Sequence, residues 1–324
     1  MSERSVLRAS VIPARRRPPF GVRDVAAYLT TLGVRRRAPS VEALHELHSA
    51  HVARVPYETL WLHLGEQWGI RPADSFHRIA HRGRGGYCFH LNGALGELLS
   101  ILGYRVTMVP AGVHNAPGAP AAPDGHLLLV VGDLPTDDHP DGRWYVDAGL
   151  GDGPRLPVPL RDGVDHQGTE TWTMSALGDD AWRLGRPAGG SFDGVSFSLA
   201  AVGIEHFEAR HAYHRTSPAS GFARTPTAQR RHATGTDIMR GLVLTRTADG
   251  VVDVETFQRP QRHVAGRDVV PGVGDADLRL HPVVLGEPDR PQHRPGGRLR
   301  LAVGDVPGAR LDVDGLISAH GSGG

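Results

Sequence analysis

The sequence is poor in cysteine and has no lysine at all. Cys88 is the single cysteine among 324 residues, and arginine supplies all 36 positive charges. One cysteine excludes an intramolecular disulfide and any zinc or iron–sulfur site that needs several cysteine ligands. The composition therefore excludes a secreted disulfide scaffold and favours a reducing, cytoplasmic environment. Whether Cys88 is an inert core residue or a nucleophile stays open at this point.

Strong net charge and long apolar runs are also missing. The 36 basic and 35 acidic residues give a formal net charge of +1, so no overall field favours nucleic acid or an anionic membrane. No segment reaches the roughly 20 apolar residues of a membrane span. The Arg-rich residues 1–18 lack the apolar core of a secretory signal, and we interpret them as a disordered tail. We expect neither nucleic acid nor a membrane as a partner, and the sequence leaves the oligomeric state open.

The spacing of apolar residues changes along the chain. Residues 24–34, 40–55 and 89–103 have the period of amphipathic helices. After residue 103 the period becomes two, which is typical of short antiparallel strands in a meander or a small barrel. Strands are predicted at 104–113, 126–134, 143–151, 169–177, 180–186, 196–202, 224–233, 238–248 and 251–257, with helices at 204–218 and 275–286.

The order of these blocks predicts an α+β protein with several segments. A helical segment covers 19–103, a β segment covers 104–212 and a mixed segment covers 213–288. Residues 289–324 are interpreted as a linker and a C-terminal extension, whose short alternating runs could add a strand or stay loosely ordered.

The residues around Cys88 suggest a reactive thiol. Gly85 and Gly86 allow a tight turn and the close approach of another group. The helix predicted just after them places Cys88 at its N-terminus, where free N–H groups and the helix dipole favour a thiolate, and Arg84 could add positive charge. A lone cysteine is more often an inert core residue. The sequence context therefore makes the two interpretations about equally good.

A nucleophilic cysteine needs a base and a group that orients the base. His126 opens the apolar strand His-Leu-Leu-Leu-Val-Val, and Asp147 closes the apolar strand Trp-Tyr-Val. A buried aspartate needs hydrogen bonds, and an imidazole N–H is a suitable partner. Taken singly, His126 could be a surface histidine and Asp147 a turn residue. The three residues together, each at the edge of a regular element, predict a triad.

These residues resemble the arylamine N-acetyltransferase family over 21–286. The family's Arg-Gly-Gly-aromatic-Cys motif is similar to residues 84–92, its His-Leu-Leu-Leu-Val strand to 126–130 and its Val-Asp-Val/Ala-Gly strand to 146–151. Weaker similarities lie at 55–60 and 216–218. The resemblance implies an N-terminal helical bundle, a central antiparallel β-barrel and a C-terminal α/β lid around a Cys-His-Asp core like that of cysteine proteases.

The resemblance also implies an activity. Cys88 would take an acyl group from acetyl-CoA or another acyl thioester and pass it to an amine, hydrazine or hydroxylamine nitrogen in a ping-pong reaction. His126 would move the protons and Asp147 would orient the imidazole. No metal and no bound cofactor are expected, because the CoA thioester is a substrate. Substrate contacts are expected at Tyr57, Glu58, Arg84, Tyr87, Gly125 and Leu150.

Two departures from the family pattern bear on the substrate. His90 replaces the usual glutamate, which predicts more positive charge around the thiol. Leu150 replaces an aromatic residue, which suggests an acceptor that does not stack as a flat aryl ring. These changes suggest an alternative function, an amide synthase of specialised metabolism that uses a thioester bound to an acyl carrier protein.

Other functions stay open at the level of the sequence. A transglutaminase-like or papain-like hydrolase uses the same Cys-His-Asp logic, and a binding homologue could have lost activity. The run His45-Glu46-Leu47-His48, followed by His51, suggests a metal site. We set it aside because its histidines are three residues apart rather than four, and we expect a surface helix there.

Overall fold

The computed structural model describes residues 20–186, 190–257 and 298–302, and the helix predicted at 275–286 lies outside these ranges. The described helices are α1 (Val22–Leu32), α2 (Val41–Arg54), α3 (Leu60–His63), α4 (Pro72–Arg82), α5 (Cys88–Leu102), η1 (Ile204–Phe207), α6 (Glu208–Thr216) and α7 (Gly221–Arg224). The described strands are β1 (Tyr57–Glu58), β2 (Arg105–His114), β3 (His126–Gly132), β4 (Trp144–Val146), β5 (Val158–Pro159), β6 (Gly163–Gln167), β7 (Glu170–Ala176), β8 (Ala181–Gly185), β9 (Gly194–Ser198), β10 (Thr227–Arg231), β11 (Gly235–Arg240), β12 (Val243–Ala248), β13 (Val251–Thr256) and β14 (Arg298–Ala302).

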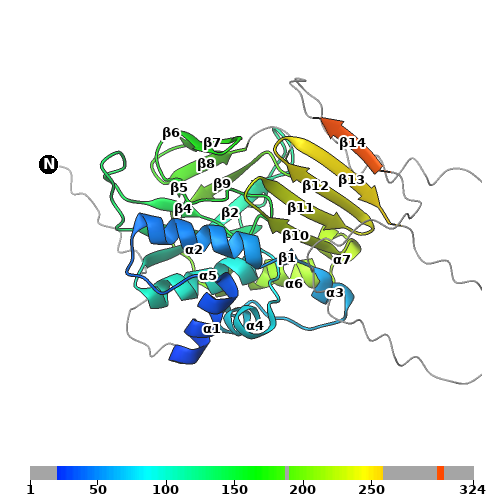
Figure 1. The fold of residues 1–324 in the computed structure, drawn as a ribbon, viewed down its shortest axis with the longest axis horizontal. Helices are drawn as coiled ribbons and strands as arrows, with labels where there is room; N and C mark the ends of the chain where they lie inside the picture. Colours follow the sequence, from blue (N-terminus) through cyan, green and yellow to red (C-terminus); the bar gives the residue numbers. More distant parts are fainter. Residues whose placement is uncertain (1–19, 187–189, 258–297, 303–324) are drawn as a thin grey trace, which may run out of the picture.

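Helices α1, α2, α4 and α5 gather at one side of the molecule, and α3 lies beside α6 and α7 (Figure 1). Local sequence sets their ends: the Ser40 hydroxyl accepts a hydrogen bond from the Ala43 N–H and caps α2. Gly33 and Gly103 take the left-handed conformation that ends α1 and α5. Helix α5 is buried along most of its length, because it packs against α4, β2 and β3. The residue at its first position is therefore held by the core.

The strands after α5 form one antiparallel sheet of eight in the order β5-β4-β3-β2-β9-β8-β7-β6. The inward side chains of both ends of this sheet meet in one apolar cluster, which includes Leu128 of β3, Tyr145 of β4 and Trp172 of β7. A flat sheet could not bring its two ends together in this way, so the sheet curls into a nearly closed barrel. This barrel confirms the predicted central antiparallel β-barrel.

A second sheet has the order β1-β10-β11-β12-β13-β14 and lies beside the barrel, next to α6 and α7 (Figure 1). Its first strand comes from the helical segment, since Tyr57 pairs with Gln229 and Glu58 with Ala228. The prediction of a single strand at 238–248 is wrong. These residues belong to two strands, β11 and β12, which form a hairpin whose turn contains Gly241 at a φ of 58°. Helices, barrel and lid sheet together confirm the predicted α+β fold class.

The expectation that α2 is a surface helix is wrong for two of its histidines. His48 and His51 are buried, because α2 packs against α1 and against β10. The Nδ1 of His48 lies 3.0 Å from the Arg155 carbonyl oxygen, and the Nε2 of His51 lies 2.9 Å from the Tyr28 hydroxyl. His51 is therefore part of the packing of α2 on α1, and His48 is part of the packing of α2 on the loop that contains Arg155.

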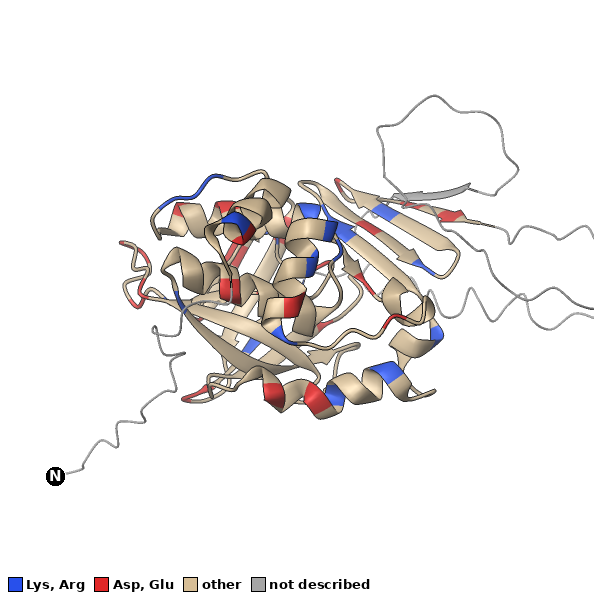
Figure 2. Cartoon of the chain, turned by 90° about the horizontal axis from the view of Figure 1, so that it is seen from below, with Lys and Arg blue, Asp and Glu red and all other residues tan. Residues whose placement is uncertain are grey.

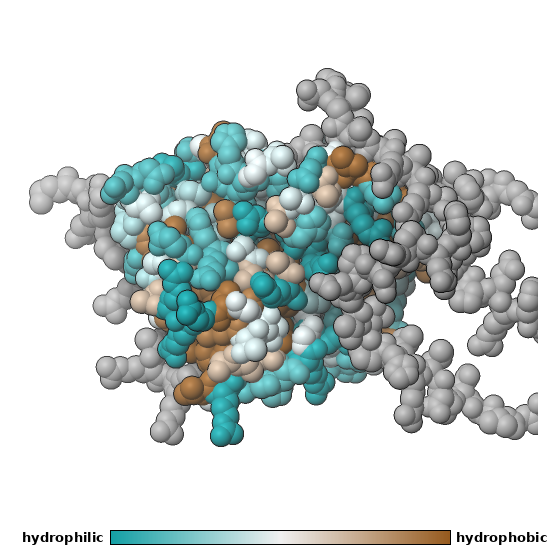
Figure 3. Space-filling model, in the orientation of Figure 1, coloured by the Kyte–Doolittle hydropathy of each residue, from teal (hydrophilic) through white to brown (hydrophobic). Residues whose placement is uncertain are grey.

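Charged residues of both signs are interspersed over the described elements (Figure 2). The face seen in Figure 3 is largely hydrophilic, with apolar side chains gathered toward its lower left. Within the described ranges, no helix combines the length and the apolar character that a membrane crossing requires.

Candidate active site

Cys88 is the first residue of α5, as the sequence predicts, and it is 4% exposed. Gly85 and Gly86 precede Cys88, and neighbouring atoms leave no room for a side chain at either position. A Cβ on Gly85 would lie 1.9 Å from the Pro56 carbonyl oxygen, and Gly86 has a φ of 128° with the His90 ring directly beside it. The N–H of Glu58 donates to the Gly86 carbonyl at 2.9 Å. The glycine turn therefore ties the start of α5 to β1.

His126 is the first residue of β3, and Asp147 directly follows the last residue of β4. Adjacent antiparallel strands bring the two side chains together, with 2.7 Å between His126 Nε2 and Asp147 Oδ2. This contact leaves Nδ1 as the ring nitrogen for the thiol, and interaction with Cys88 contributes to the raised pKa of His126. The structure thus brings the three predicted residues together.

The Asp147 carboxylate is buried and surrounded by donors. Its Oδ1 accepts hydrogen bonds from Asn92 Nδ2 and the Gly149 N–H, each at 2.8 Å. Its Oδ2 accepts from His126 and from the Tyr145 hydroxyl, each at 2.7 Å. Four donors compensate for the loss of water around a buried carboxylate. The group is fixed in place and stays ionised.

The electrostatics of the pair favour a charged imidazole. Burial alone would lower the pKa of His126, but Asp147 and Cys88 beside it raise that pKa to about 10. Burial alone would raise the pKa of Asp147, but His126 and the hydrogen bonds of the carboxylate keep it below its usual value. The raised pKa of His126 therefore favours an imidazolium at neutral pH, with Asp147 and Cys88 as its neighbours.

Two residues that hold Asp147 were not assigned a role from the sequence. Asn92 lies one helical turn after Cys88, and besides Asp147 it bonds the Leu127 carbonyl and the Ala148 N–H. Tyr145 lies two residues before Asp147 on the same face of β4. Spacing could have identified both residues. Asn92 lies four residues after Cys88 on a predicted helix, and Tyr145 lies two residues before Asp147 on a predicted strand. Asn92 and Tyr145 are positioning residues.

The residues expected to contact substrate have different surroundings in the structure. Tyr57 lies near the thiol: burial, and then the charge of Cys88, raise the pKa of Tyr57 well above its usual value. Glu58 and Arg84 hold each other, with Arg84 Nε 2.6 Å from Glu58 Oε1 and Nη2 3.0 Å from Oε2. Arg84 also lies over the Trp68 ring. The Arg84 charge is thus shared with Glu58, and its predicted substrate contact stays a prediction.

The other three expected contact residues serve local packing. Tyr87 is fully buried and its hydroxyl lies 2.5 Å from His211 Nδ1. Gly125 forms the turn before His126, with its N–H donating to the Ala122 carbonyl at 2.9 Å. Leu150 packs in the apolar cluster of the barrel. A role of these three residues in substrate binding stays a prediction.

His90 does not add positive charge at the site, so that expectation is wrong. The ring is fully buried among Trp61, Trp68 and Tyr87, and burial, together with the nearby charge of Arg78, lowers the pKa of His90 well below its usual value. Its Nδ1 lies 3.3 Å from the Tyr87 N–H, at the N-terminus of α5. His90 is a neutral capping residue.

Replacing His90 with glutamate is expected to stabilise the protein. Arg78 is buried near His90, and its Nε has no hydrogen-bond partner among the described residues. A carboxylate at position 90 would give that cation a partner and could also cap α5. We expect the free energy of unfolding to rise by about 1–2 kcal/mol, measured by urea denaturation. His90→Gln, which has the same length without the charge, is the control, and equal stabilisation by both variants would contradict the prediction.

Comparison with known proteins agrees with this fold. The N-acetyltransferase family model matches residues 40–265, which is more than half of the chain. Among solved structures, the arylamine N-acetyltransferase of M. smegmatis has a TM-score of 0.65 and 28% identity, over 72% of this chain and 86% of that one. The Nocardia farcinica enzyme has a TM-score of 0.63 and 32% identity, over 72% and 84%.

Curated relatives carry the same name. "Arylamine N-acetyltransferase 2" of Mesocricetus auratus is 27% identical over 246 residues, 68% of this chain and 82% of that protein. "Arylamine N-acetyltransferase" of Mycolicibacterium smegmatis is 34% identical over 164 residues, 48% and 58% of the two chains. The protein is therefore an acyltransferase that acts on amines. It belongs to the arylamine N-acetyltransferase family.

Proposed function

We propose that this protein transfers an acetyl group from acetyl-CoA to an amine nitrogen through an acetyl-cysteine at Cys88. The observation that carries the proposal is the buried Cys88–His126–Asp147 arrangement, with an imidazolium beside a thiol at a helix N-terminus. Such an arrangement supplies an activated nucleophile and a proton carrier in one place.

The first half-reaction starts from a thiolate and an imidazolium. The Cys88 sulfur attacks the thioester carbonyl carbon, a new carbon–sulfur bond forms, and the bond to the CoA sulfur breaks. His126 gives its proton to the departing CoA thiolate, so CoA leaves as the thiol and the imidazole becomes neutral. Asp147 keeps the ring in the orientation that this transfer needs.

The second half-reaction returns the site to its starting state. The amine nitrogen attacks the acetyl carbon and gives a proton to the neutral His126, while the bond to the Cys88 sulfur breaks. The product is an amide, and the site again holds a thiolate and an imidazolium. No metal or further reactant is needed for this balance.

Incubation with acetyl-CoA, followed by intact mass measurement, tests the proposal. An adduct of one acetyl group is expected on the wild-type chain and not on Cys88→Ala, and an added arylamine should remove it. An adduct formed only from a longer acyl thioester would instead support an amide synthase. No adduct from any thioester would contradict acyl transfer through Cys88.

The charge of His126 should be visible in thiol alkylation. At pH 7 we expect iodoacetamide to modify wild-type Cys88 about ten times faster than Cys88 in His126→Asn, because a free thiol is only a few per cent ionised there. The pKa of His126 near 10 means that the imidazolium is present below that pH and is lost as the pH rises through it, so the advantage should shrink towards pH 10. His166→Asn, at an exposed histidine of β6, is the control. Equal rates for wild type and His126→Asn at pH 7 would contradict the prediction.

A further inference from the structure

A cavity of about 300 Å³ lies away from the triad, between the second half of α2, the loop after Asp147 and the β10–β11 turn of the lid sheet. Cys88, His126 and Asp147 do not line it. Its residues are Gly33, Val34, Glu46, Ser49, Ala50, Ala53, Arg54, Arg155, Arg231, His232 and Ala233.

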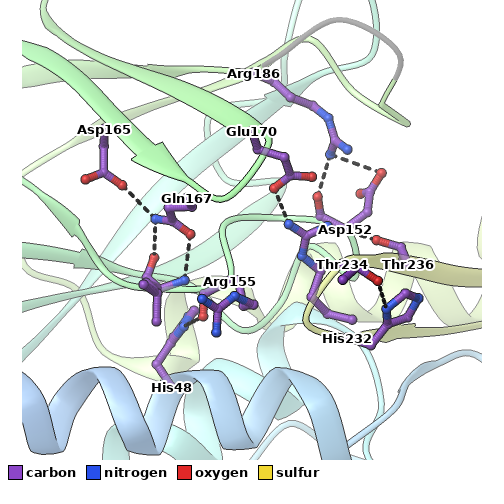
Figure 4. Close-up of polar contacts among 12 residues, drawn as sticks. His48, Asp152, Arg155, Asp165, Gln167, Glu170, Arg186, His232, Thr234 and Thr236 are labelled. Carbon is purple, nitrogen blue, oxygen red and sulfur yellow. Dashed lines mark hydrogen bonds and ion pairs between the residues drawn. The ribbon is translucent and has the colours of Figure 1, made fainter. Parts of the chain in front are cut away.

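Three elements contribute basic residues to the lining. Arg54 comes from α2, Arg155 from the loop after Asp147, and Arg231 with His232 from the end of β10. Figure 4 shows Arg155 and His232 above α2, together with the polar contacts around them. Three elements far apart in the sequence therefore direct basic groups to one cavity.

Acidic residues compensate only part of this positive charge. Glu46 is the acidic residue of the lining, and its Oε2 already pairs with Arg37 at 2.9 Å. Arg231 is buried and pairs with Glu170, and His232 Nε2 lies 3.9 Å from Asp237 Oδ1, so these two groups have acidic partners. Among the described residues, the guanidinium groups of Arg54 and Arg155 make no hydrogen bond or ion pair. Arg54 and Arg155 therefore contribute positive charge to one cavity, which suits the binding of an anion.

We propose that this cavity binds a phosphate-bearing small molecule through Arg54 and Arg155. Planar guanidinium groups present paired N–H donors that match phosphate oxygens. The buried Arg231 is held by Glu170 and by the Thr236 hydroxyl at 3.0 Å, so its charge is compensated and the anion would be held by Arg54 and Arg155. A bound anion links α2, the loop after Asp147 and the lid sheet.

The cavity is also connected to the triad by the chain. The carbonyl of Arg155 lies 3.0 Å from His48 Nδ1, and the buried His48 ring lies close enough to Asp147 for that carboxylate to act on the pKa of His48. Burial nevertheless lowers the pKa of His48, so the ring acts as a neutral spacer. An anion that fixes Arg155 thus acts on the segment that carries Asp147.

Titration calorimetry with inorganic pyrophosphate tests the site without reference to acyl transfer. Wild type should bind pyrophosphate, more tightly at 20 mM than at 200 mM salt. Arg54→Gln/Arg155→Gln should bind at least ten times more weakly. Both arginines are at least partly exposed, so the variant should keep the wild-type unfolding temperature, which is measured alongside.

The matched control is Arg23→Gln/Arg71→Gln, which removes the same charge from two exposed arginines outside the cavity. It should bind pyrophosphate like the wild type. Equal affinity of both double variants, or no binding by any of the three proteins at millimolar pyrophosphate, would overturn the proposal.

A second titration identifies the source of the phosphate. If CoA binding weakens in Arg54→Gln/Arg155→Gln as much as pyrophosphate binding does, while the binding of phosphate-free pantetheine does not change, the cavity takes the phosphates of CoA. If CoA binding is unchanged and pyrophosphate binding is weakened, the cavity takes a separate phosphorylated molecule.

Discussion

Asp147→Asn is expected to lower kcat/KM for acetyl transfer by roughly four orders of magnitude. The carboxylate accepts four hydrogen bonds, and an amide nitrogen in its place is a donor that would face other donors. His126 would lose both the negative charge that raises its pKa and the partner that orients its ring. Turnover of an arylamine with acetyl-CoA, measured from initial rates over a range of donor concentrations, checks the effect.

A second buried aspartate separates this role from simple damage to the fold. Asp152 lies five residues further along, pairs with Arg186 at 3.0 Å and accepts hydrogen bonds from Ser191, as Figure 4 shows for the Arg186 contact. Asp152→Asn should lower the free energy of unfolding by about 3 kcal/mol and leave kcat/KM within a few-fold of wild type at a temperature where it is folded. If Asp152→Asn lost as much turnover as Asp147→Asn, the special role of Asp147 would be refuted.

The meeting of Cys88, His126 and Asp147 could be predicted because each of these residues stands at the end of a regular element. Cys88 follows two glycines, His126 follows a turn, and Asp147 precedes a glycine, so local sequence sets all three positions. Period-two and helical spacing also gave the order of helices and strands. Both features depend on residues close to one another in the chain.

What the sequence did not predict depends on contacts between distant segments. The pairing of β1 with β10 joins residues about 170 positions apart, and nothing near Tyr57 identifies its partner. The burial of His48 and the neutral state of His90 depend on the elements packed over them. The ion pair of Arg84 with Glu58 has the same cause. The local sequence pattern therefore predicted the wrong surroundings for some of these side chains and predicted nothing for the others.

Gly149→Ala is the second large effect we expect, and it tests how closely the aspartate loop must approach the nucleophile. A Cβ on Gly149 would lie 2.6 Å from Cys88 Cα, 2.7 Å from Cys88 Cβ and 2.8 Å from Asn92 Nδ2. The first two neighbours are fixed by the start of α5 and cannot rotate away. The loop that carries Asp147 must therefore move away from α5, and with it the carboxylate that orients His126.

A displacement of this kind should affect both catalysis and stability. A shift of about 1 Å between reacting groups lowers rates roughly 100-fold, and overpacking a core costs about 1–3 kcal/mol of unfolding free energy. We expect Gly149→Ala to slow both acetyl transfer and Cys88 alkylation at pH 7, measured with folded protein. Gly69→Ala is the control, since a Cβ there meets nothing within 4 Å. Wild-type rates in Gly149→Ala would show that the triad tolerates a wider gap between α5 and the Asp147 loop, and that the close approach serves packing alone.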